Sequence, residues 1–550
     1  MKLVKIVSMG LLFSCSAFLQ AQTTIYDANR LMGSDLNGTA RFVGMGGAMG
    51  GLGGDITTMG TNPAGIGIYR SNDVMLSFGF DNTGMKANGV AHDKFHGSFD
   101  NVGFVFATKI GNHTPLRFAN FGFNYRKMKS FSRSMLLGGV FNTSQTVQMA
   151  NMLNFNFDGQ FDPILEKALK SDDAFVNPEL PWLGIMAYNA YLVNPNYKQK
   201  PSQSPSAPAG NTGGVNGQPL PEGEELFEGY TPYWMQGDKV QQQYSSKESG
   251  GIHAFDLNGA LNFHDRFYLG ATLGLYCVDY DRSSVYNEDF TDAKGNGQGG
   301  YTLGNEFGVN GSGVDFKLGF ILRPFEMSSF RIGAAVHTPT YFSLTERNRA
   351  YLDFDVVHND EIKKGVSKPY DAAGRDTEGE YDYRLITPWK FNVNMGYTVG
   401  SLAAFGVEYE YSDRSAGRLK DPDGYEMGQT ADIEAMMKAV HTFRIGGEFK
   451  LMPEMSLRLG YNYISSPMKS DAFKYLAPNS MRTDTEFANP GETQNYAFGL
   501  GYRGKSFYMD MAYLLNTYKE TFYAFDCVDL PGTEVTHTNH KVMLTLGMRF

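Results

Sequence analysis

Runs of about ten residues in which apolar and polar side chains alternate recur from residue 73 to the end of the chain. Because successive side chains of a β-strand point to opposite faces, each run predicts a strand with one apolar and one polar face. A closed barrel, with the apolar face in lipid and the polar face toward a lumen, is the fold that this pattern favours. The two sides of the last run are Val542, Leu544, Leu546, Met548 and Phe550, and Lys541, Thr545, Gly547 and Arg549.

The composition of the 550-residue chain excludes several other classes of protein. No apolar run of about 18 residues follows the N-terminus and the mean hydropathy is -0.32, which excludes a helical membrane protein. The formal net charge of -10 makes nucleic acid a poor partner. We find no composition shift that would mark a linker between domains, so one large sheet explains the length of the chain.

Residues 1–21 have the features of a secretory signal peptide. Lys2 and Lys5 precede an apolar run, and Leu19-Gln20-Ala21 resembles the small-residue cleavage site of a signal peptide. The residues up to Cys15 also faintly resemble a lipobox. In that case the mature chain would begin at a lipidated Cys15. The two other cysteines, Cys277 and Cys527, are too few for a disulfide framework, and a bridge between them is not predictable.

The alternating runs predict about fourteen antiparallel strands, an even number as bacterial barrels require. They lie at 74–80, 99–109, 117–129, 250–264, 266–283, 306–324, 330–348, 381–399, 402–415, 443–449, 456–463, 495–503, 506–524 and 541–550. Short turns are expected at Asn112-His113, His264-Asp265, Glu326–Ser328, Gly400-Ser401, Pro453-Glu454 and Gly504-Lys505. Long loops are expected near 82–97, 130–249, 284–305, 349–380, 416–440, 468–490 and 525–536. This alternation places the short turns at one rim, and both chain ends with them.

The stretch from Arg41 to Gly65 is too rich in glycine to form a regular helix or strand alone. Such a segment needs surrounding structure to hold it, and we expect it to fold inside the barrel as a plug. A phosphate-binding loop is disfavoured, because Ile66 stands where a P-loop has its lysine. A flexible linker is the other alternative.

The same stretch carries a family resemblance. Gly38-Thr39-Ala40-Arg41, Gly44–Ala48, Gly54-Asp55 and Asn62-Pro63-Ala64-Gly65 resemble the N-terminal hatch of the FadL/TodX-like outer-membrane transporters of hydrophobic compounds. The resemblance implies a hatch at 22–70, a transmembrane barrel at 71–550 and location in the bacterial outer membrane, as a monomer in contact with lipid. The residues it marks as hatch or gate are Gly44, Gly46, Gly47, Asp55, Asn62, Pro63, Ala64 and Gly65.

Three further expectations rest on this resemblance. Hatch movement would gate passage, and an inward kink of the third strand near Gly122 would open the wall sideways. The terminal Phe550 resembles the signal read by the barrel-assembly machinery. The haem-receptor label often given to such proteins raises the question whether His337 ligates haem iron.

The region 130–249 is expected to be a long extracellular loop with helices. Asp162-Pro163 predicts the start of a helix. In the family, helices of this loop form an apolar groove that first captures the ligand, although the same side chains could simply pack onto the barrel rim. The candidate capture residues are Ile164, Leu165, Leu169, Trp182, Leu183, Ile185 and Met186. The Pro-, Ser- and Gly-rich stretch from Lys198 to Glu225 is expected to be disordered.

No catalytic motif or metal site stands out, so we expect neither an enzyme nor a cofactor. His92 and His96 have a helical metal spacing but lie between glycines, and Asp421–Gly424 is closer to a turn than to a calcium loop. Arginines on the predicted lumen face could bind a ligand carboxylate, or could pair with acids and the hatch. They are Arg444, Arg458, Arg503 and Arg549, with Lys541 and Glu448 beside them.

The sequence therefore favours a channel for passive uptake of small hydrophobic molecules, such as long-chain fatty acids or aromatic compounds. Two alternatives remain: a barrel that serves secretion machinery or another protein partner, and a haem-binding receptor.

Overall fold

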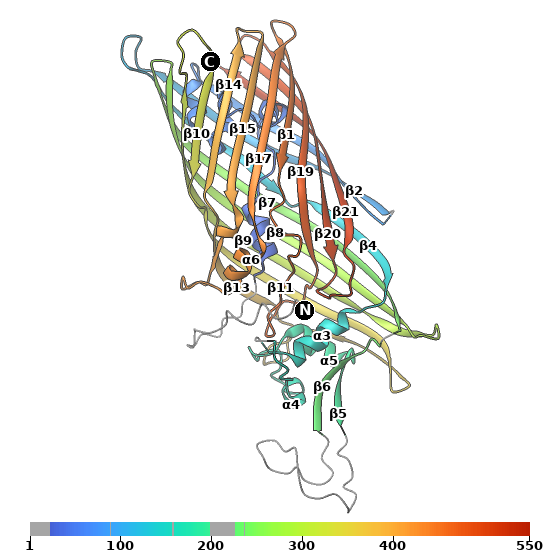
Figure 1. Ribbon diagram of the computed structural model, residues 1–550. Coiled ribbons are helices and arrows are strands. Elements are labelled where there is room, and N and C mark those ends of the chain that lie inside the picture. The colour runs from blue at the N-terminus through green and yellow to red at the C-terminus, as the bar shows by residue number, and fades with distance from the viewer. Residues whose placement is uncertain (1–22, 89, 157–158, 199–225, 236) are drawn as a thin grey trace, which may run out of the picture.

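The computed structural model describes residues 23–550 except 89, 157–158, 199–225 and 236; the expected signal peptide, Cys15 and the stretch expected to be disordered lie outside these residues. The described strands form a closed antiparallel ring (Figure 1). It closes because β1 (Asp73–Ala87) pairs with β2 (Val90–Lys109) on one side and with β21 (Thr533–Arg549) on the other. The predicted barrel of fourteen strands is confirmed.

Ten positions of the ring are single strands and four are split into two parts. The remaining single strands are β7 (Lys239–Phe263), β8 (Phe267–Thr291), β9 (Gly297–Leu322), β17 (Ala439–Lys450), β18 (Met455–Ile464), β19 (Phe487–Arg503) and β20 (Phe507–Tyr523). The split strands are β3 (Leu116–Ser130) with β4 (Arg133–Phe141), β10 (Arg331–His337) with β11 (Tyr341–His358), β13 (Gly379–Ile386) with β14 (Lys390–Val399), and β15 (Ala403–Asp413) with β16 (Arg418–Lys420). Pro339 and Pro388 lie at two of these breaks, where a missing N–H cannot join the ladder.

The six predicted short turns all join neighbouring strands at one end of the barrel, which we call the short-turn end. Two of the predicted long loops were wrong. Residues 82–97 and 284–305 mostly continue β1 into β2 and β8 into β9, with tight turns at their tips. Another short strand, β12 (Glu361–Ser367), forms a hairpin with β11 in a further predicted loop.

The outer face of the barrel is apolar over the half nearest the short turns. Side chains that alternate with buried polar ones are exposed there, as expected for a surface that contacts lipid. On β21, Val542 and Met548 are exposed whereas Thr545 is buried. Similar exposed residues include Phe121, Leu273, Phe316, Val393, Val407, Ile445, Phe498 and Met511.

A small domain covers the other end of the barrel, which we call the long-loop end (Figure 1). It comprises α3 (Gln145–Asn154), α4 (Glu166–Leu169), α5 (Trp182–Asn189), β5 (Val193–Lys198) and β6 (Leu226–Pro232). Ser144 caps α3 by accepting a hydrogen bond from the Thr146 amide. The predicted helix after Pro163 begins later than expected, at Glu166. A further short helix, α6 (Gln429–Met436), lies between β16 and β17.

The N-terminal segment runs through the lumen from the long-loop end to the short-turn end (Figure 1). Its elements are α1 (Ile25–Met32), α2 (Ala40–Gly44) and the 3-10 helices η1 (Ile56–Gly60) and η2 (Pro63–Ile68). Thr23 donates to Glu346 of β11, 2.8 Å away, so the expectation that both chain ends share the short-turn rim was wrong for the N-terminus. At the other end, the Asn72 amide donates to the Phe550 carbonyl. Within the described residues, no helix is long and apolar enough to cross a membrane.

Candidate functional site

A row of glycines on the inner wall contacts the part of the N-terminal segment from Gly44 to Gly51. Its members are register partners on four neighbouring strands: Gly396, Gly406, Gly446 and Gly460. A Cβ on Gly446 would lie 2.2 Å from the Met45 carbonyl oxygen, and one on Gly460 would lie 2.0 Å from the Gly46 nitrogen. No residue with a side chain could therefore replace a glycine of this row while the segment stays against the sheet.

The Asn-Pro-Ala corner makes a second close contact with the wall. Asn62 caps η2 by accepting from the Ala64 amide and donates to the Phe320 carbonyl, 3.1 Å away. A Cβ on Gly319 would lie 2.2 Å from the Asn62 side-chain oxygen. In the same way Asp55 caps η1 through the Thr57 amide. Together, these two contacts hold backbone of the N-terminal segment close against the inner wall near the short-turn end.

The predicted gate residues fall within this packed region. Gly46 and Gly47 adopt φ of 62° and 82°, a backbone conformation that favours glycine. Gly44 packs against Gly499 of β19, and a Cβ on Gly65 would meet Thr58. Pro63 and Ala64 are buried in η2.

Three of the four predicted lumen arginines are ion-paired. Arg458 joins Glu448 and Asp510, each at 2.6 Å, and Arg41 of the N-terminal segment also binds Glu448. Arg444 pairs with two glutamates of β15, and Arg549 pairs with Asp73. Arg503 is exposed, with its guanidinium over the ring of Tyr508. Only Arg444 of the four lines the cavity described below.

Residues 465–486, which join β18 to β19 and which we call the strap, hold α1 in place. Arg482 of the strap donates to Asp27 of α1 at 2.5 Å and also pairs with Asp484. Burial alone would raise the pKa of the Asp27 carboxyl, but the charges of Arg482 and Arg30 hold that pKa well below its usual range. The strap also touches the loop domain, because the Trp182 amide donates to the Ser480 carbonyl.

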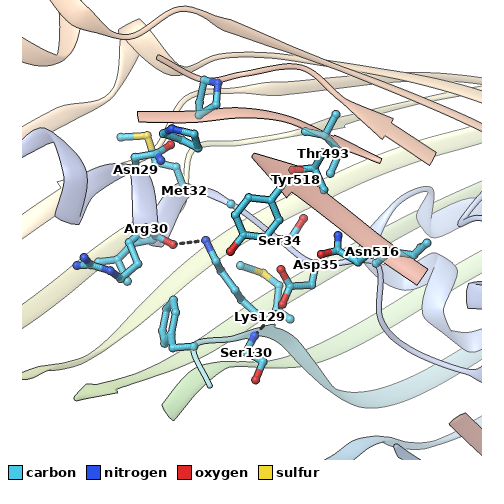
Figure 2. A pocket seen from close by; sticks show the side chains of 18 of the residues that line it. Asn29, Arg30, Met32, Ser34, Asp35, Lys129, Ser130, Thr493, Asn516 and Tyr518 are labelled. Atoms are coloured by element: carbon cyan, nitrogen blue, oxygen red, sulfur yellow. Dashed lines mark hydrogen bonds between the residues drawn. The ribbon is translucent and has the colours of Figure 1, made fainter. Parts of the chain in front are cut away.

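A cavity of about 450 Å³ lies beside α1 and the turn that follows it. Figure 2 shows Asn29, Met32 and Asp35 of the N-terminal segment together with Lys129 and Tyr518 of the barrel wall, all of which line this cavity. Its lining combines apolar side chains with many charged ones. The N-terminal segment thus forms part of the wall of a chamber inside the barrel.

The barrel wall is incompletely paired next to this cavity. Among the described residues, β2 pairs with β3 only between Asn101 and Lys109, so residues 90–99 of β2 pair with β1 alone. β4 pairs with β7 alone, although it lies next to β2. We call the unpaired boundary between β2 and β4 the seam (Figure 1).

The cavity reaches both sides of the seam, since its lining includes Asp81 and His96 on one side and residues 128–133 on the other. The third strand is interrupted here, at residues 131–132. It is continuous at Gly122, which pairs with Val105 and Asn258, so the expected position of the kink was wrong.

His337 gives no support to haem ligation. Its Nε2 lies 2.7 Å from the Thr61 carbonyl oxygen, to which it donates, and the ring is buried. His92 and His96 lie on β2 and not in a loop. No group of three or more potential metal ligands occurs in the part of the chain that the structure describes, and Cys277 and Cys527 form no disulfide there.

Most of the predicted capture residues lie inside the loop domain. Trp182, Leu183, Ile185 and Met186 are at most 3% exposed and belong to one apolar core with Leu169. Ile164 packs against this core, and Leu165 is 68% exposed. As the domain stands, only Leu165 of the set presents most of its surface to a ligand.

We expect Trp182→Ala to lower the free energy of unfolding of the loop domain by about 3–5 kcal/mol, because it empties part of this core. Hydrogen exchange of the α3 and α5 amides should rise while the barrel strands stay protected. Leu165→Ala is the control and should leave exchange unchanged. Equal effects of the two substitutions would contradict the core assignment.

Comparisons with known proteins identify the fold. No family model matches the chain, and no curated protein matches its sequence. A crystal structure of a Pseudomonas aeruginosa FadL homologue covers 94% of this chain and 99% of its own, with 12% identity and a TM-score of 0.50. The Pseudomonas putida toluene transporter TodX covers the same shares, with 11% identity and a TM-score of 0.45. The first likeness shows that the chain has the FadL-type fold, as the resemblance implied.

Proposed function

We propose that this chain is an outer-membrane channel through which small hydrophobic molecules diffuse inward without an energy source. The observation that carries the proposal is the cavity that reaches the unpaired seam, while the N-terminal segment packs against the barrel wall beyond it. A solute that enters the cavity has a route sideways into lipid. The straight route along the barrel axis is closed by the hatch, the name that we now use for residues 23–70.

The physical drive is the transfer of apolar surface out of water. Each Å² of apolar surface that leaves water for lipid contributes about 25 cal/mol, so a lateral exit needs no further energy input. This opening has an energetic cost. The strand edges at the seam expose backbone N–H and C=O groups that are hydrogen-bonded elsewhere in a closed barrel. In our proposal the strap and the loop domain form the outer entrance.

A bulky side chain at the seam should slow uptake. Ser132 lines the cavity at the strand break, so Ser132→Trp should lower the rate at which proteoliposomes take up labelled naphthalene by about tenfold or more. Ser134→Trp on the same strand is the matched control, because Ser134 is not part of the lining. Unchanged uptake by the Ser132 variant would contradict exit through the seam.

A further inference from the structure

Three tyrosine–histidine pairs on the outer face of the barrel share one geometry. In each pair the tyrosine hydroxyl lies 2.7 to 2.9 Å from the Nδ1 atom of a histidine on the neighbouring strand. The two rings also pack against each other, with centroids 5.9 to 6.1 Å apart. The members, which we call the Tyr–His pairs, are Tyr125 with His253, Tyr409 with His441, and Tyr513 with His540.

The Tyr–His pairs also share one place in the strand register. Each tyrosine lies on a strand that runs toward the long-loop end, and its histidine lies on the strand that returns. The histidine comes two residues before the register partner of the tyrosine, so it is nearer to the long-loop end. These register partners are Phe255 for Tyr125, Phe443 for Tyr409 and Val542 for Tyr513.

All three pairs lie where the outer face changes from apolar to polar. On their short-turn side the exposed residues of the same strands are apolar, namely Phe121, Val407 and Met511. On their long-loop side the outward residues are Lys127, Asp413 and Thr538. Tyrosine rings occur at this level in membrane proteins because it is where lipid tails give way to head groups. The pairs therefore face lipid head groups.

The hydrogen bond at Nδ1 leaves the other nitrogen of each imidazole as a donor. A phenol donates better than it accepts, so we assign the tyrosine hydroxyl as the donor to Nδ1 and place the proton of the neutral imidazole on Nε2. The protonated ring carries an N–H at Nε2 as well. Among the described residues, no partner occupies Nε2 of His253, His441 or His540.

The pair at His253 has a cation beside it. Lys127 is the register partner of His253. A Cβ on Gly251 would lie 3.2 Å from Lys127 Cε and 3.6 Å from His253 Nε2, and because residue 251 is glycine no side chain of its own separates these two groups. Asp279, the register partner of Gly251, forms no ion pair with Lys127 within the described chain. The Lys127 ammonium is therefore available to a group outside the protein.

We propose that the Tyr–His pairs bind the phosphate groups of lipids in the leaflet on the long-loop side of the barrel, the outer leaflet. Phosphate oxygens are strong hydrogen-bond acceptors, and Lys127 favours an anion over a neutral sugar hydroxyl. An imidazole that a tyrosine already holds in place loses little freedom when it binds. Phenylalanine would anchor the strands at the interface equally well, so the histidine adds a donor. This site does not depend on what passes through the barrel.

The test counts the lipids that bind to the purified full chain. The protein in a maltoside detergent, which carries no phosphate, is titrated with lipid A that bears two phosphates and with the same glycolipid after both phosphates are removed. Native mass spectrometry gives the number of bound copies. We expect up to three copies of the phosphorylated lipid, bound about tenfold or more tightly than the dephosphorylated one, as a charge-assisted hydrogen bond gives.

A variant that combines His253→Phe, His441→Phe and His540→Phe keeps an aromatic ring beside each tyrosine but removes the donor, so it should bind both lipids equally. If this variant does not fold, Lys127→Met with His253→Phe should lose one of the bound copies. The control is His92→Phe, an exposed position near the tip of the β1–β2 hairpin, which should bind as wild type does. Equal binding of the two lipids by wild type would overturn the proposal, as would an unchanged preference in the histidine variants.

Discussion

Replacing Gly446 by valine should leave the barrel permanently open. A Cβ at this position would lie 2.2 Å from the Met45 carbonyl oxygen, and the nearest atoms are hatch backbone that has no side-chain freedom to move aside. This steric clash is relieved only if the hatch shifts away from the wall, because the strand itself is hydrogen-bonded to its neighbours on both sides. Moving the hatch opens the axial route that it fills.

Passage of a water-soluble solute reports this change. Liposomes that contain Gly446→Val should swell rapidly in a small sugar, whereas wild-type liposomes should stay closed, with a rate difference of about tenfold or more. The matched control is Gly259→Val, since a Cβ on this lipid-facing glycine would meet no atom within 4 Å. If both variants stay closed, the glycine row does not determine where the hatch lies.

Removing the carboxylate of Asp27 should release α1 from the strap. Asp27→Asn breaks the ion pair with Arg482, which is buried at about 1% side-chain exposure, and breaking a buried pair in this way costs about 3–5 kcal/mol. Amide exchange of residues 25–32 should therefore accelerate about a hundredfold or more, while residues 40–68 keep their protection. Glu361→Gln, which breaks an exposed pair with Lys363, is the control and should change nothing.

The pH dependence of this contact follows from the depressed pKa of Asp27. A carboxyl whose pKa is lower in the folded protein stabilises the fold above its unfolded pKa of about 3.9, and the stabilisation is lost as pH falls toward the folded value. Protection of α1 should therefore persist from pH 7 to about pH 4 and fall only in stronger acid. Loss of protection near pH 6 would contradict the ion pair as the anchor.

The membrane-spanning half of the barrel could be predicted from the sequence because lipid imposes a strict pattern on it. From Val542 to Phe550, outward apolar residues alternate with inward residues such as Thr545, and this signal locates the strands and the short turns. Residues 82–97 and 284–305 were missed because the strands there extend past the apolar band. Both faces of such a strand can be polar, so the pattern disappears while the backbone pairing continues.

The candidate site was only partly predictable for a different reason. Asn62-Pro63-Ala64 could be assigned to the hatch through its resemblance to the family motif, and in the structure Asn62 caps η2, which begins at Pro63. The sequence could not predict that Arg414, which lines the cavity, lacks an ion pair among the described residues, because a sequence does not show which acid each arginine contacts. The sequence left open whether Arg444 and Arg458 bind a ligand or pair with acids, and in the structure both pair with carboxylates from other strands. The sequence could not decide whether Trp182 lines a capture groove or packs onto the barrel, because apolar loop residues look alike whether they are exposed or packed.

The central claim is that residues 23–70 close a barrel that would otherwise conduct. The most direct test is the ionic conductance of single molecules in planar bilayers, measured on the full chain and on a chain that lacks residues 23–70. We predict a large, steady conductance for the shortened chain and almost none for the full chain. Equal conductance of the two, with the shortened barrel correctly folded, would contradict the account.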